Sequence, residues 1–512
     1  MHDAVLSACS RFGEKTAIVD ASLPEADPRR RISYSRYGEL VESLGRGLQN
    51  AGLKTGETVG IFLPNSWEFA AAYHASTLAG LVPTPLNPHY REREVRFQLQ
   101  DAGVAALISD SAQLAGIDLS GLPNVRRVWT TRTHAVGTES FSSLLGSGGA
   151  LRATSGNSQD ELAALPYSSG TTGMPKGVML THENLVENVR QFLVPGEIAT
   201  TRAHDVVLCF LPLYHIYGLN VVLNPSLMVG ATLVLMPRFD VEQVARLTQE
   251  ESLTWINLVP PAMNALANAA EEGRFPRAGE HAIRGAKCGA APLAPDLVKR
   301  FTQLTGIRVR QGYGMTEASP VTHLGYLEEE LYYPESIGHV VGETECRVLR
   351  EDGSECLVGE PGELVMRGRQ FMRGYWNNPE TTAQVLRDGW YYSGDIAVRD
   401  DRGFYKIVDR RKELIKYKGF PIAPAEVEAV LMEHPAVQDC GVVGLQDAEC
   451  GEIPIAFVVP RRPDTPDLER QLPAFVADRL ISYKQPRAVR IVASIPRNPS
   501  GKILRKELRA QL

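Results

Sequence analysis

The stretch from Tyr167 to His182 reads YSSGTTGMPKGVMLTH, and it indicates both the fold and the chemistry of this 512-residue chain. Serine, threonine and glycine residues surround one lysine, Lys176, so hydroxyls, backbone amides and an ammonium group can converge on a polyanion. Apolar residues precede the stretch at 162–165 and follow Lys176 at 178–180, which predicts a loop between two buried strands. A loop of this kind is suited to holding a triphosphate, since glycine lets backbone amides approach phosphate oxygens.

The spacing differs from that of the commonest nucleotide-binding loop. A Walker A loop needs G-x-x-x-x-G-K-[ST], whereas Lys176 is followed by Gly177 and no hydroxyl. A flexible surface loop is the alternative for a segment rich in serine, threonine and glycine. The Pro175-Lys176-Gly177 run between two apolar segments favours the nucleotide-binding interpretation.

The composition predicts a soluble multidomain protein, because hydrophobic residues make up 44% of the chain. The 54 basic and 60 acidic residues give a formal net charge of -6 without blocks of like charge, which does not favour nucleic acid or an anionic membrane as a partner. The N-terminal MHDAVLSACSRFGEK lacks a secretory pattern, and the most apolar window, 219–236, is interrupted by polar residues and glycine. We therefore expect a cytoplasmic protein without a membrane span.

Several other kinds of catalytic site are not expected. The seven cysteines form no C-x-x-C pair and have no nearby histidine pair, so buried reduced thiols are favoured over a zinc or iron site. The chain also lacks G-x-S-x-G, H-E-x-x-H and a dinucleotide-binding G-x-G-x-x-G in a strand–helix context.

Helix-like and strand-like segments alternate along most of the chain. Apolar residues at helical spacing predict a helix over 37–51, and short apolar runs predict strands at 58–63, 105–108, 206–211 and 232–236. Such interleaving is typical of an α/β fold with largely parallel sheets.

The charge run at 409–413 predicts a domain boundary, because a separate pattern begins after it. A helix is expected from Pro424, followed by strands at 440–443 and 453–459, a helix over 467–480 and a strand at 488–493. Pro473 is expected to break or kink the second helix. The predicted domains are 1–409 and 410–512.

Long motifs along nearly the whole chain resemble the adenylate-forming superfamily of acyl- and aryl-CoA synthetases, peptide-synthetase adenylation domains and luciferases. The resemblance is strongest to coumarate-CoA ligase-like acyl-CoA synthetases, through QGYGMTEASP at 311–320, KELIKYKGFPIAPAEVEAVL at 412–431 and PRNPSGKILRKELR at 496–509. It implies a large N-terminal domain of α/β subdomains with mixed sheets, and a small mobile C-terminal α+β lid.

The resemblance also implies a nucleotide site. Tyr313 is expected to stack on adenine, Thr316 to contact the α-phosphate and Glu317 to hold Mg²⁺, which prefers oxygen ligands. Asp395 is expected to bind the ribose hydroxyls with help from Arg410. The further residues assigned to ATP or coenzyme A are Ser168, Ser169, Gly170, Thr171, Thr172, Gly173, Lys176, Gln311, Gly312, Gly314, Lys418 and Gly419.

The acid pocket is implied by PLYHIYG at 212–218, in which His215 matches the family's gating residue. Without the surrounding motif, an ordinary packed histidine is the alternative. The other residues expected to line the pocket are Tyr217, Gly218, Met263, Gly289, Ala290, Ala291 and Gly314. Small residues there leave space for an aryl, fatty or bulky polycyclic acid.

Three lysines carry the remaining roles that the resemblance implies. Lys502 matches the adenylation lysine, Lys412 lies at the hinge, and Lys416 is assigned to thioester formation. The alternative for Lys502 is a solvated surface charge near a chain terminus.

The implied function is an ATP-dependent acyl-CoA ligase that uses ATP, Mg²⁺ and coenzyme A. The acid is activated as an acyl-adenylate with release of pyrophosphate, and a thiol then displaces AMP. The alternatives are a ligase that loads the phosphopantetheine of a carrier protein, a luciferase-like activity, and a nonenzymatic nucleotide-binding scaffold.

Overall fold

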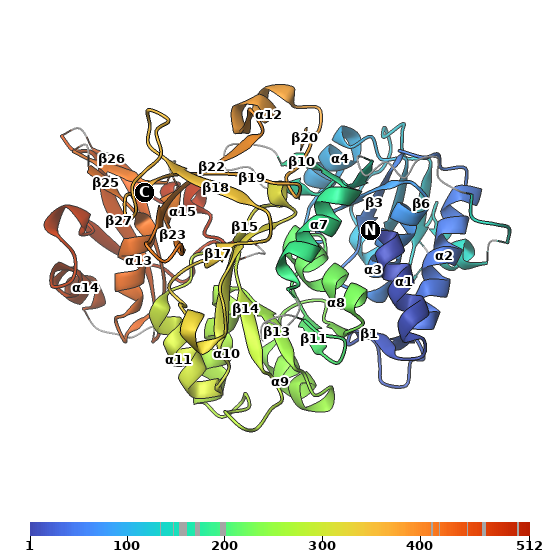
Figure 1. The fold of residues 1–512 in the computed structure, drawn as a ribbon, viewed down its shortest axis with the longest axis horizontal. Helices are drawn as coiled ribbons and strands as arrows, with labels where there is room; N and C mark the ends of the chain where they lie inside the picture. The colour runs from blue at the N-terminus through green and yellow to red at the C-terminus, as the bar shows by residue number, and fades with distance from the viewer. Residues whose placement is uncertain are drawn as a thin grey trace.

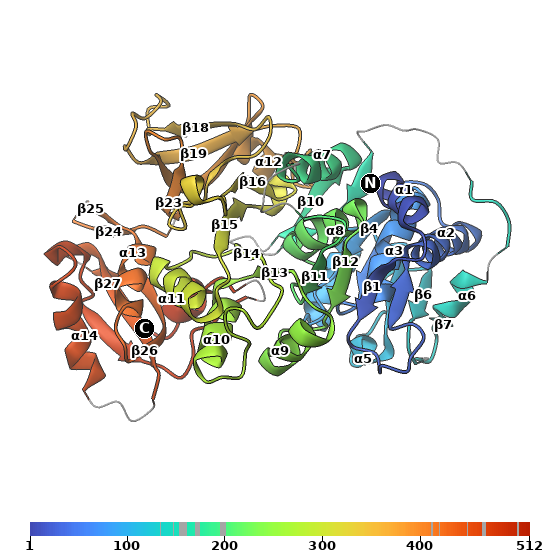
Figure 2. The ribbon, with the colours of Figure 1, turned by 60° about the horizontal axis from the view of Figure 1, so that its bottom comes forward.

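The computed structural model describes residues 1–133, 135–146, 148–152, 161–168, 175–194, 201–410, 413–418, 420–447, 449–462, 467–498 and 501–512. Within these residues the strands form five sheets (Figure 1). The segment from residue 415 onward lies at one end of the molecule, and the first three helices lie at the other in both views (Figure 2).

The largest sheet, with nine described strands, is mostly parallel and carries antiparallel strands at both edges. Its central strands are buried on both faces, as expected for parallel strands covered by helices. In spatial order the strands are β17 (His339–Val340), β16 (Val321–Leu324), β15 (Val309–Gly314), β14 (Gly285–Cys288), β13 (Trp255–Leu258), β11 (Val206–Cys209), β12 (Thr232–Leu235), β1 (Thr16–Asp20) and β2 (Arg31–Ser33).

A second, parallel sheet lies among the N-terminal helices. All residues of helix α3 (Trp67–Leu78) are buried, polar ones such as Glu68 and His74 included, so the helix is enclosed by the core. The strands of this sheet are β4 (Val82–Pro85), β3 (Thr58–Phe62), β5 (Ala106–Ser109), β6 (Arg127–Thr130) and β7 (Glu139–Ser140). The other helices of the N-terminal part are α1 (His2–Phe12), α2 (Tyr34–Asn50), α4 (Glu92–Asp101), α5 (Ser111–Leu114) and α6 (Ser142–Leu145).

Two antiparallel sheets complete the larger part of the molecule. The first contains β8 (Leu162–Ala164), β9 (Tyr167–Ser168), β10 (Lys176–Thr181) and β20 (Gly374–Tyr375). The second contains β18 (Glu345–Leu349), β19 (Gly362–Arg367), β21 (Leu386–Arg387), β22 (Trp390–Arg399) and β23 (Tyr405–Arg410). The intervening helices are α7 (His182–Phe192), the π-helix η1 (Gly218–Leu223), α8 (Asn224–Val229), α9 (Val241–Glu250), α10 (Pro260–Glu271), α11 (Pro295–Thr305), η2 (Thr316–Ala318), η3 (Glu329–Leu331) and α12 (Pro379–Val385).

The C-terminal segment forms a mixed sheet with apolar clusters of its own. Its strands are β24 (Ile415–Tyr417), β25 (Phe420–Ile422), β26 (Val437–Asp447), β27 (Gly451–Pro460) and β28 (Ala488–Ile491), and its helices are α13 (Pro424–Met432), α14 (Leu468–Ala477), η4 (Ser482–Lys484) and α15 (Arg505–Arg509).

The predicted α/β class is confirmed, and the predicted elements are found within a few residues of their expected bounds. Two details differ from the sequence predictions. Lys176 is the first residue of β10 and pairs with Ser168, so the strand begins earlier than expected. Pro473 lies inside α14 without ending it, because Leu468, Leu472 and Val476 bury one face of that helix. The seven cysteines are unpaired, and all but Cys346 and Cys450 are buried.

Candidate active site

One cavity of about 2590 Å³ is lined by both the C-terminal segment and the larger sheets. It brings together residues from segments that lie far apart in the sequence. The sequence-predicted site residues that line it are Ser168, Lys176, His215, Tyr217, Gly289, Ala290, Ala291, Gln311, Gly312, Tyr313, Gly314, Thr316, Glu317, Asp395, Arg410, Lys416 and Lys502.

Three predicted residues lie elsewhere. Met263 belongs to α10 and is fully buried, and Lys418 follows β24 and is exposed; neither lines the cavity. Gly218 is also buried, and a side chain would not fit there, since a Cβ would lie 2.3 Å from the Pro212 carbonyl oxygen. Ser169, Gly170, Thr171, Thr172, Gly173, Lys412 and Gly419 lie outside the described residues.

Glu317 lies on the short helix η2, directly after β15, and is 8% exposed. Its Oε1 accepts hydrogen bonds from the Tyr375 hydroxyl at 2.8 Å and from Ser168 Oγ at 3.3 Å. Its backbone carbonyl accepts from the amide of Met372 at 2.7 Å. The carboxylate is therefore held in place in the cavity wall. An oxygen ligand in such a position suits Mg²⁺.

The turn that carries Glu317 is fixed from behind by two fully buried asparagines that sequence reasoning missed. Asn188 donates to the Val321 carbonyl at 2.7 Å and accepts from the Val321 amide at 3.0 Å. Asn220 donates to the carbonyl of Ser319, which has a φ of 68°. A signal was available, because asparagine is a poor helix former and a buried amide needs partners.

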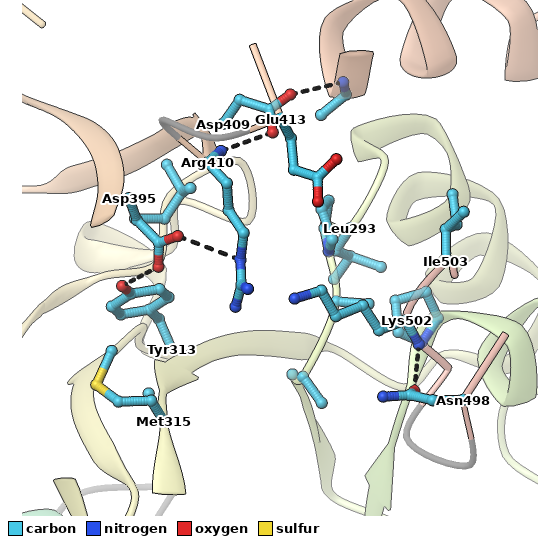
Figure 3. Close-up of a pocket in the computed structure, with 18 of the residues that line it drawn as sticks. Leu293, Tyr313, Met315, Asp395, Asp409, Arg410, Glu413, Asn498, Lys502 and Ile503 are labelled. Carbon is cyan, nitrogen blue, oxygen red and sulfur yellow. Dashed lines mark hydrogen bonds and ion pairs between the residues drawn. The ribbon is translucent and has the colours of Figure 1, made fainter. Parts of the chain in front are cut away.

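A second group of contacts joins the end of β15 to strands β22 and β23. The hydroxyl of Tyr313 donates to Asp395 Oδ2 at 2.5 Å, and Arg410 Nε lies 3.4 Å from Asp395 Oδ1 (Figure 3). Asp395 and Arg410 are also directly paired residues of the two strands. Burial raises the pKa of Tyr313 well above its usual value, so the phenol remains a neutral donor.

Lys502 extends from a C-terminal hairpin toward Arg410 (Figure 3). The hairpin is closed by the Lys502 amide, which donates to Asn498 Oδ1 at 2.8 Å, and by Arg497, which donates to the Gly501 carbonyl at 2.7 Å and to Asp439. Burial, and then the charge of Arg410, lower the pKa of Lys502 to about 8. The ammonium thus lies in a partly desolvated position, where it would interact strongly with an anion.

The hairpin touches the larger part of the molecule at Gly501. This glycine has a φ of +83°, and a Cβ on it would lie 3.1 Å from Pro261 Cδ, at the start of α10. A residue without a side chain is therefore needed to bring Lys502 this close to the cavity.

His215 lies in the cavity wall beside the π-helix. Its Nδ1 accepts from the backbone amide of Tyr217 at 3.2 Å, and burial lowers the pKa of His215 to about 4. The imidazole is therefore neutral, with its proton on Nε2. A π-helix is often found at a functional site, and η1 begins directly after this motif.

Lys287 is a further cavity residue that sequence reasoning missed. It belongs to β14, is 4% exposed, and its ammonium lies 4.6 Å from the centre of the Phe192 ring. Burial, and then the charge of Arg310, lower the pKa of Lys287 well below its usual value. No sequence signal pointed to it, because no strand was predicted at 285–288 and lysine is usually exposed.

Two family models match the chain. The AMP-binding enzyme model matches residues 6–376, and the AMP-binding enzyme C-terminal domain model matches residues 426–502. The chain belongs to this family of adenylate-forming enzymes, as its motifs predicted. The predicted cofactors ATP, Mg²⁺ and coenzyme A are those that acyl-CoA ligases of the family use.

Curated relatives match over the full chain. The chain is 39% identical to 4-coumarate–CoA ligase 5 of Oryza sativa subsp. japonica, covering 100% of this chain and 94% of the relative. It is 36% identical to 4-coumarate–CoA ligase 1 of Arabidopsis thaliana, covering 100% and 92%.

Solved structures have the same architecture. ATP-bound MatB from Rhodopseudomonas palustris superposes with a TM-score of 0.88 at 28% identity, covering 99% of this chain and 98% of that one. A benzoate CoA ligase from Burkholderia xenovorans LB400 superposes with a TM-score of 0.88 at 25% identity, covering 99% of both chains. Among the described residues, no helix has the length and apolar character needed to cross a membrane.

Proposed function

We propose that this protein is an ATP-dependent ligase that joins an aryl carboxylic acid to coenzyme A through an acyl-adenylate. The observation that carries the proposal is the meeting of Lys502, Glu317 and Asp395 in one cavity, from three separate segments. The full-length similarity to 4-coumarate–CoA ligases supports an aryl acid as the substrate class.

In this proposal ATP binds along the wall formed by β15 and β22. Tyr313 contacts adenine, Asp395 accepts from the ribose hydroxyls with Arg410 beside it, and Thr316 contacts the α-phosphate. The Tyr313–Asp395 and Asp395–Arg410 contacts support these roles, because they hold the carboxylate at the cavity surface. Glu317 would hold Mg²⁺, which neutralises phosphate charge when bound.

Two lysines would stabilise the charge that develops when the acid attacks the α-phosphorus. A carboxylate is a poor electrophile, so it is first converted to a mixed anhydride with release of pyrophosphate. Lys502, on the C-terminal hairpin, and Lys176, at the start of β10, both line the cavity. Their ammonium groups act by electrostatic stabilisation and need no covalent chemistry of their own.

The acid would lie between the π-helix and the small residues that follow β14. Gly289, Ala290 and Ala291 line the cavity and leave room for a flat ring. His215 would gate the carboxylate end. The Lys287 amine in the cavity wall supports an acid with a polar ring substituent, because a buried amine needs a polar partner.

For the second half-reaction we propose that residues 410–512 rotate as a lid on residues 1–409. The separate apolar clusters of the C-terminal sheet support this division. Rotation about Lys412 would withdraw Lys502 and present Lys416, which already lines the cavity, together with Lys418 and Gly419 to coenzyme A, whose thiol displaces AMP. A carrier-protein phosphopantetheine is the alternative acceptor.

The test is a screen for pyrophosphate release with aryl, medium-chain, long-chain and polycyclic acids, followed by assay of thioester formation. Aryl acids with coenzyme A should give the highest kcat/KM. A higher rate with a holo-carrier protein would replace coenzyme A as the acceptor. No pyrophosphate release with any acid would leave only the nonenzymatic scaffold.

A further inference from the structure

Tyr375 lies next to the proposed metal ligand but has no role in the scheme above. It belongs to β20, which pairs with β10 so that Tyr375 lies opposite Val178. The Tyr375 amide donates to Thr382 Oγ1 at 2.9 Å, which ties the strand to α12. The backbone at this position is thus fixed on both sides.

The Tyr375 side chain connects two of the proposed catalytic residues. It is 7% exposed, its hydroxyl donates to Glu317 Oε1 at 2.8 Å, and Lys176 Nζ lies 5.3 Å from the centre of its ring. Ser168 Oγ makes a longer contact to the same carboxylate oxygen, at 3.3 Å. Among the described residues, both hydrogen-bond donors to this carboxylate therefore act on Oε1, and Oε2 has no donor.

The hydroxyl remains a donor under the conditions of the reaction. A tyrosine hydroxyl with an ordinary pKa of about 10 is protonated at neutral pH, and the Tyr375 hydroxyl is the donor to Glu317 Oε1. A neutral phenol beside a carboxylate donates one strong, charge-assisted hydrogen bond.

We propose that Tyr375 is a positioning residue that fixes Oε1 of Glu317 and leaves Oε2 available to a divalent cation. This inference rests on the metal-binding role of Glu317 in the proposed function. Hydrogen bonds to the outer side of a metal ligand set its orientation, and their removal commonly lowers metal affinity about 10–100-fold. The cation–π contact gives Lys176 a fixed neighbour on the same ring.

The experiment measures how much Mg²⁺ contributes to nucleotide binding. The dissociation constant of α,β-methylene-ATP is determined by calorimetry with Mg²⁺ and with EDTA. The readout is the constant in EDTA divided by the constant in Mg²⁺. Tyr375→Phe should reduce this ratio about tenfold relative to wild type, with little change in the EDTA value. A purely structural defect would weaken both values together.

Three further variants make the result decisive. Tyr326→Phe removes a hydroxyl that contacts His339, away from the cavity, and should leave the ratio unchanged. Ser168→Ala removes the weaker donor and should lower the ratio less than Tyr375→Phe; it also provides the test if Tyr375→Phe does not fold. Glu317→Gln should abolish the Mg²⁺ contribution.

Different failures have different meanings. A wild-type ratio in Tyr375→Phe, together with a loss in Glu317→Gln, would overturn the role of Tyr375 alone. A wild-type ratio in Glu317→Gln would overturn the metal-binding role of Glu317 in the proposed function, and this inference with it.

Discussion

The turn that carries Glu317 and the hairpin that carries Lys502 reach the same cavity but are held in different ways. The turn is fixed by two buried asparagines, by the backbone amide of Met372 and by the hydroxyl of Tyr375. The hairpin is held within its own segment by Arg497 and Asn498, and it meets α10 through Gly501. The first arrangement suits a residue that stays in place, and the second suits one that arrives and leaves.

Charged side chains lie around Asp409, the last residue of the predicted N-terminal domain. The Asp409 carboxylate accepts from the Ala425 amide at 3.1 Å, and Arg505 contacts Glu428 and Glu413. Burial raises the pKa of Asp409 to about 6. The ion pairs of Arg505 lie within residues 410–512, so they would remain intact when the proposed lid rotates, whereas the Asp409–Ala425 bond joins the two proposed domains.

The largest expected effect comes from removing Lys502, which the hairpin of the proposed lid carries. Lys502→Ala should lower the rate of acyl-adenylate formation roughly 10²–10³-fold, because an ammonium that stabilises developing charge is lost. Thioester formation from supplied acyl-adenylate should change little. ATP–pyrophosphate exchange and single-turnover thiolation measure the two steps.

Lys506→Ala is the matched control, since Lys506 is exposed on α15 and does not line the cavity. Equal losses in both half-reactions of Lys502→Ala would contradict the idea that the hairpin serves only one of them.

Substitutions behind the turn that carries Glu317 should instead lower the stability of the protein. Asn188→Ala leaves the buried amide and carbonyl of Val321 without the side chain that now pairs with both, which should cost about 2–3 kcal/mol. The shift in the urea midpoint, followed by tryptophan fluorescence, measures this cost. Asn50→Ala, at the exposed end of α2, should change the free energy of unfolding by less than about 0.5 kcal/mol. Equal changes in the two variants would argue against a role for Asn188 in fixing the turn that carries Glu317.

The pH dependence should differ between the two half-reactions, because only adenylation depends on the charge of Lys502. Its pKa in the folded protein is lowered to about 8, so its positive charge is lost as the pH rises through 8. The rate of adenylation should then fall about fivefold between pH 8 and pH 9, and the decline should begin at a higher pH when bound phosphates stabilise the charge. Thiolation from supplied acyl-adenylate should lack this decline. In Lys502→Arg the alkaline decline should disappear, and its persistence would assign the titration to another group.

The smallest effect is expected from the support of the hairpin. Arg497→Ala removes the bond to the Gly501 carbonyl and a half-exposed pair with Asp439, worth about 1 kcal/mol together, which corresponds to about a fivefold slower adenylation. Arg497→Lys should restore part of the rate. A loss as large as that of Lys502→Ala would mean that the hairpin is held as firmly as the turn.

The motifs predicted the elements and most cavity-lining residues because their glycines, hydroxyls and charges report directly on backbone geometry and ligand chemistry. Tyr313, Asp395 and Lys502 come together from three distant segments, as the family resemblance implied. Their contact distances could not be predicted, because they depend on how three sheets pack.

Residues that act from behind the cavity left weaker signals. Asn188 and Asn220 lie on helices and resemble ordinary polar positions until their burial is known. Met263 was expected in the pocket, but it is buried in the core, because a shift of one or two positions along α10 decides which face a side chain takes. Lys287 shows the reverse case: a lysine is usually expected at the surface, but this one is buried.

The close approach of Gly501 to Pro261 has a practical consequence for engineering. Any side chain at position 501 would strain a backbone with φ of +83° and would push the hairpin away from α10. In such a variant the proposed lid would not reach the adenylation position. The variant would not form acyl-adenylate but would still transfer the acyl group of supplied acyl-adenylate to a thiol. A single methyl group could thereby turn a two-step ligase into a one-step transferase.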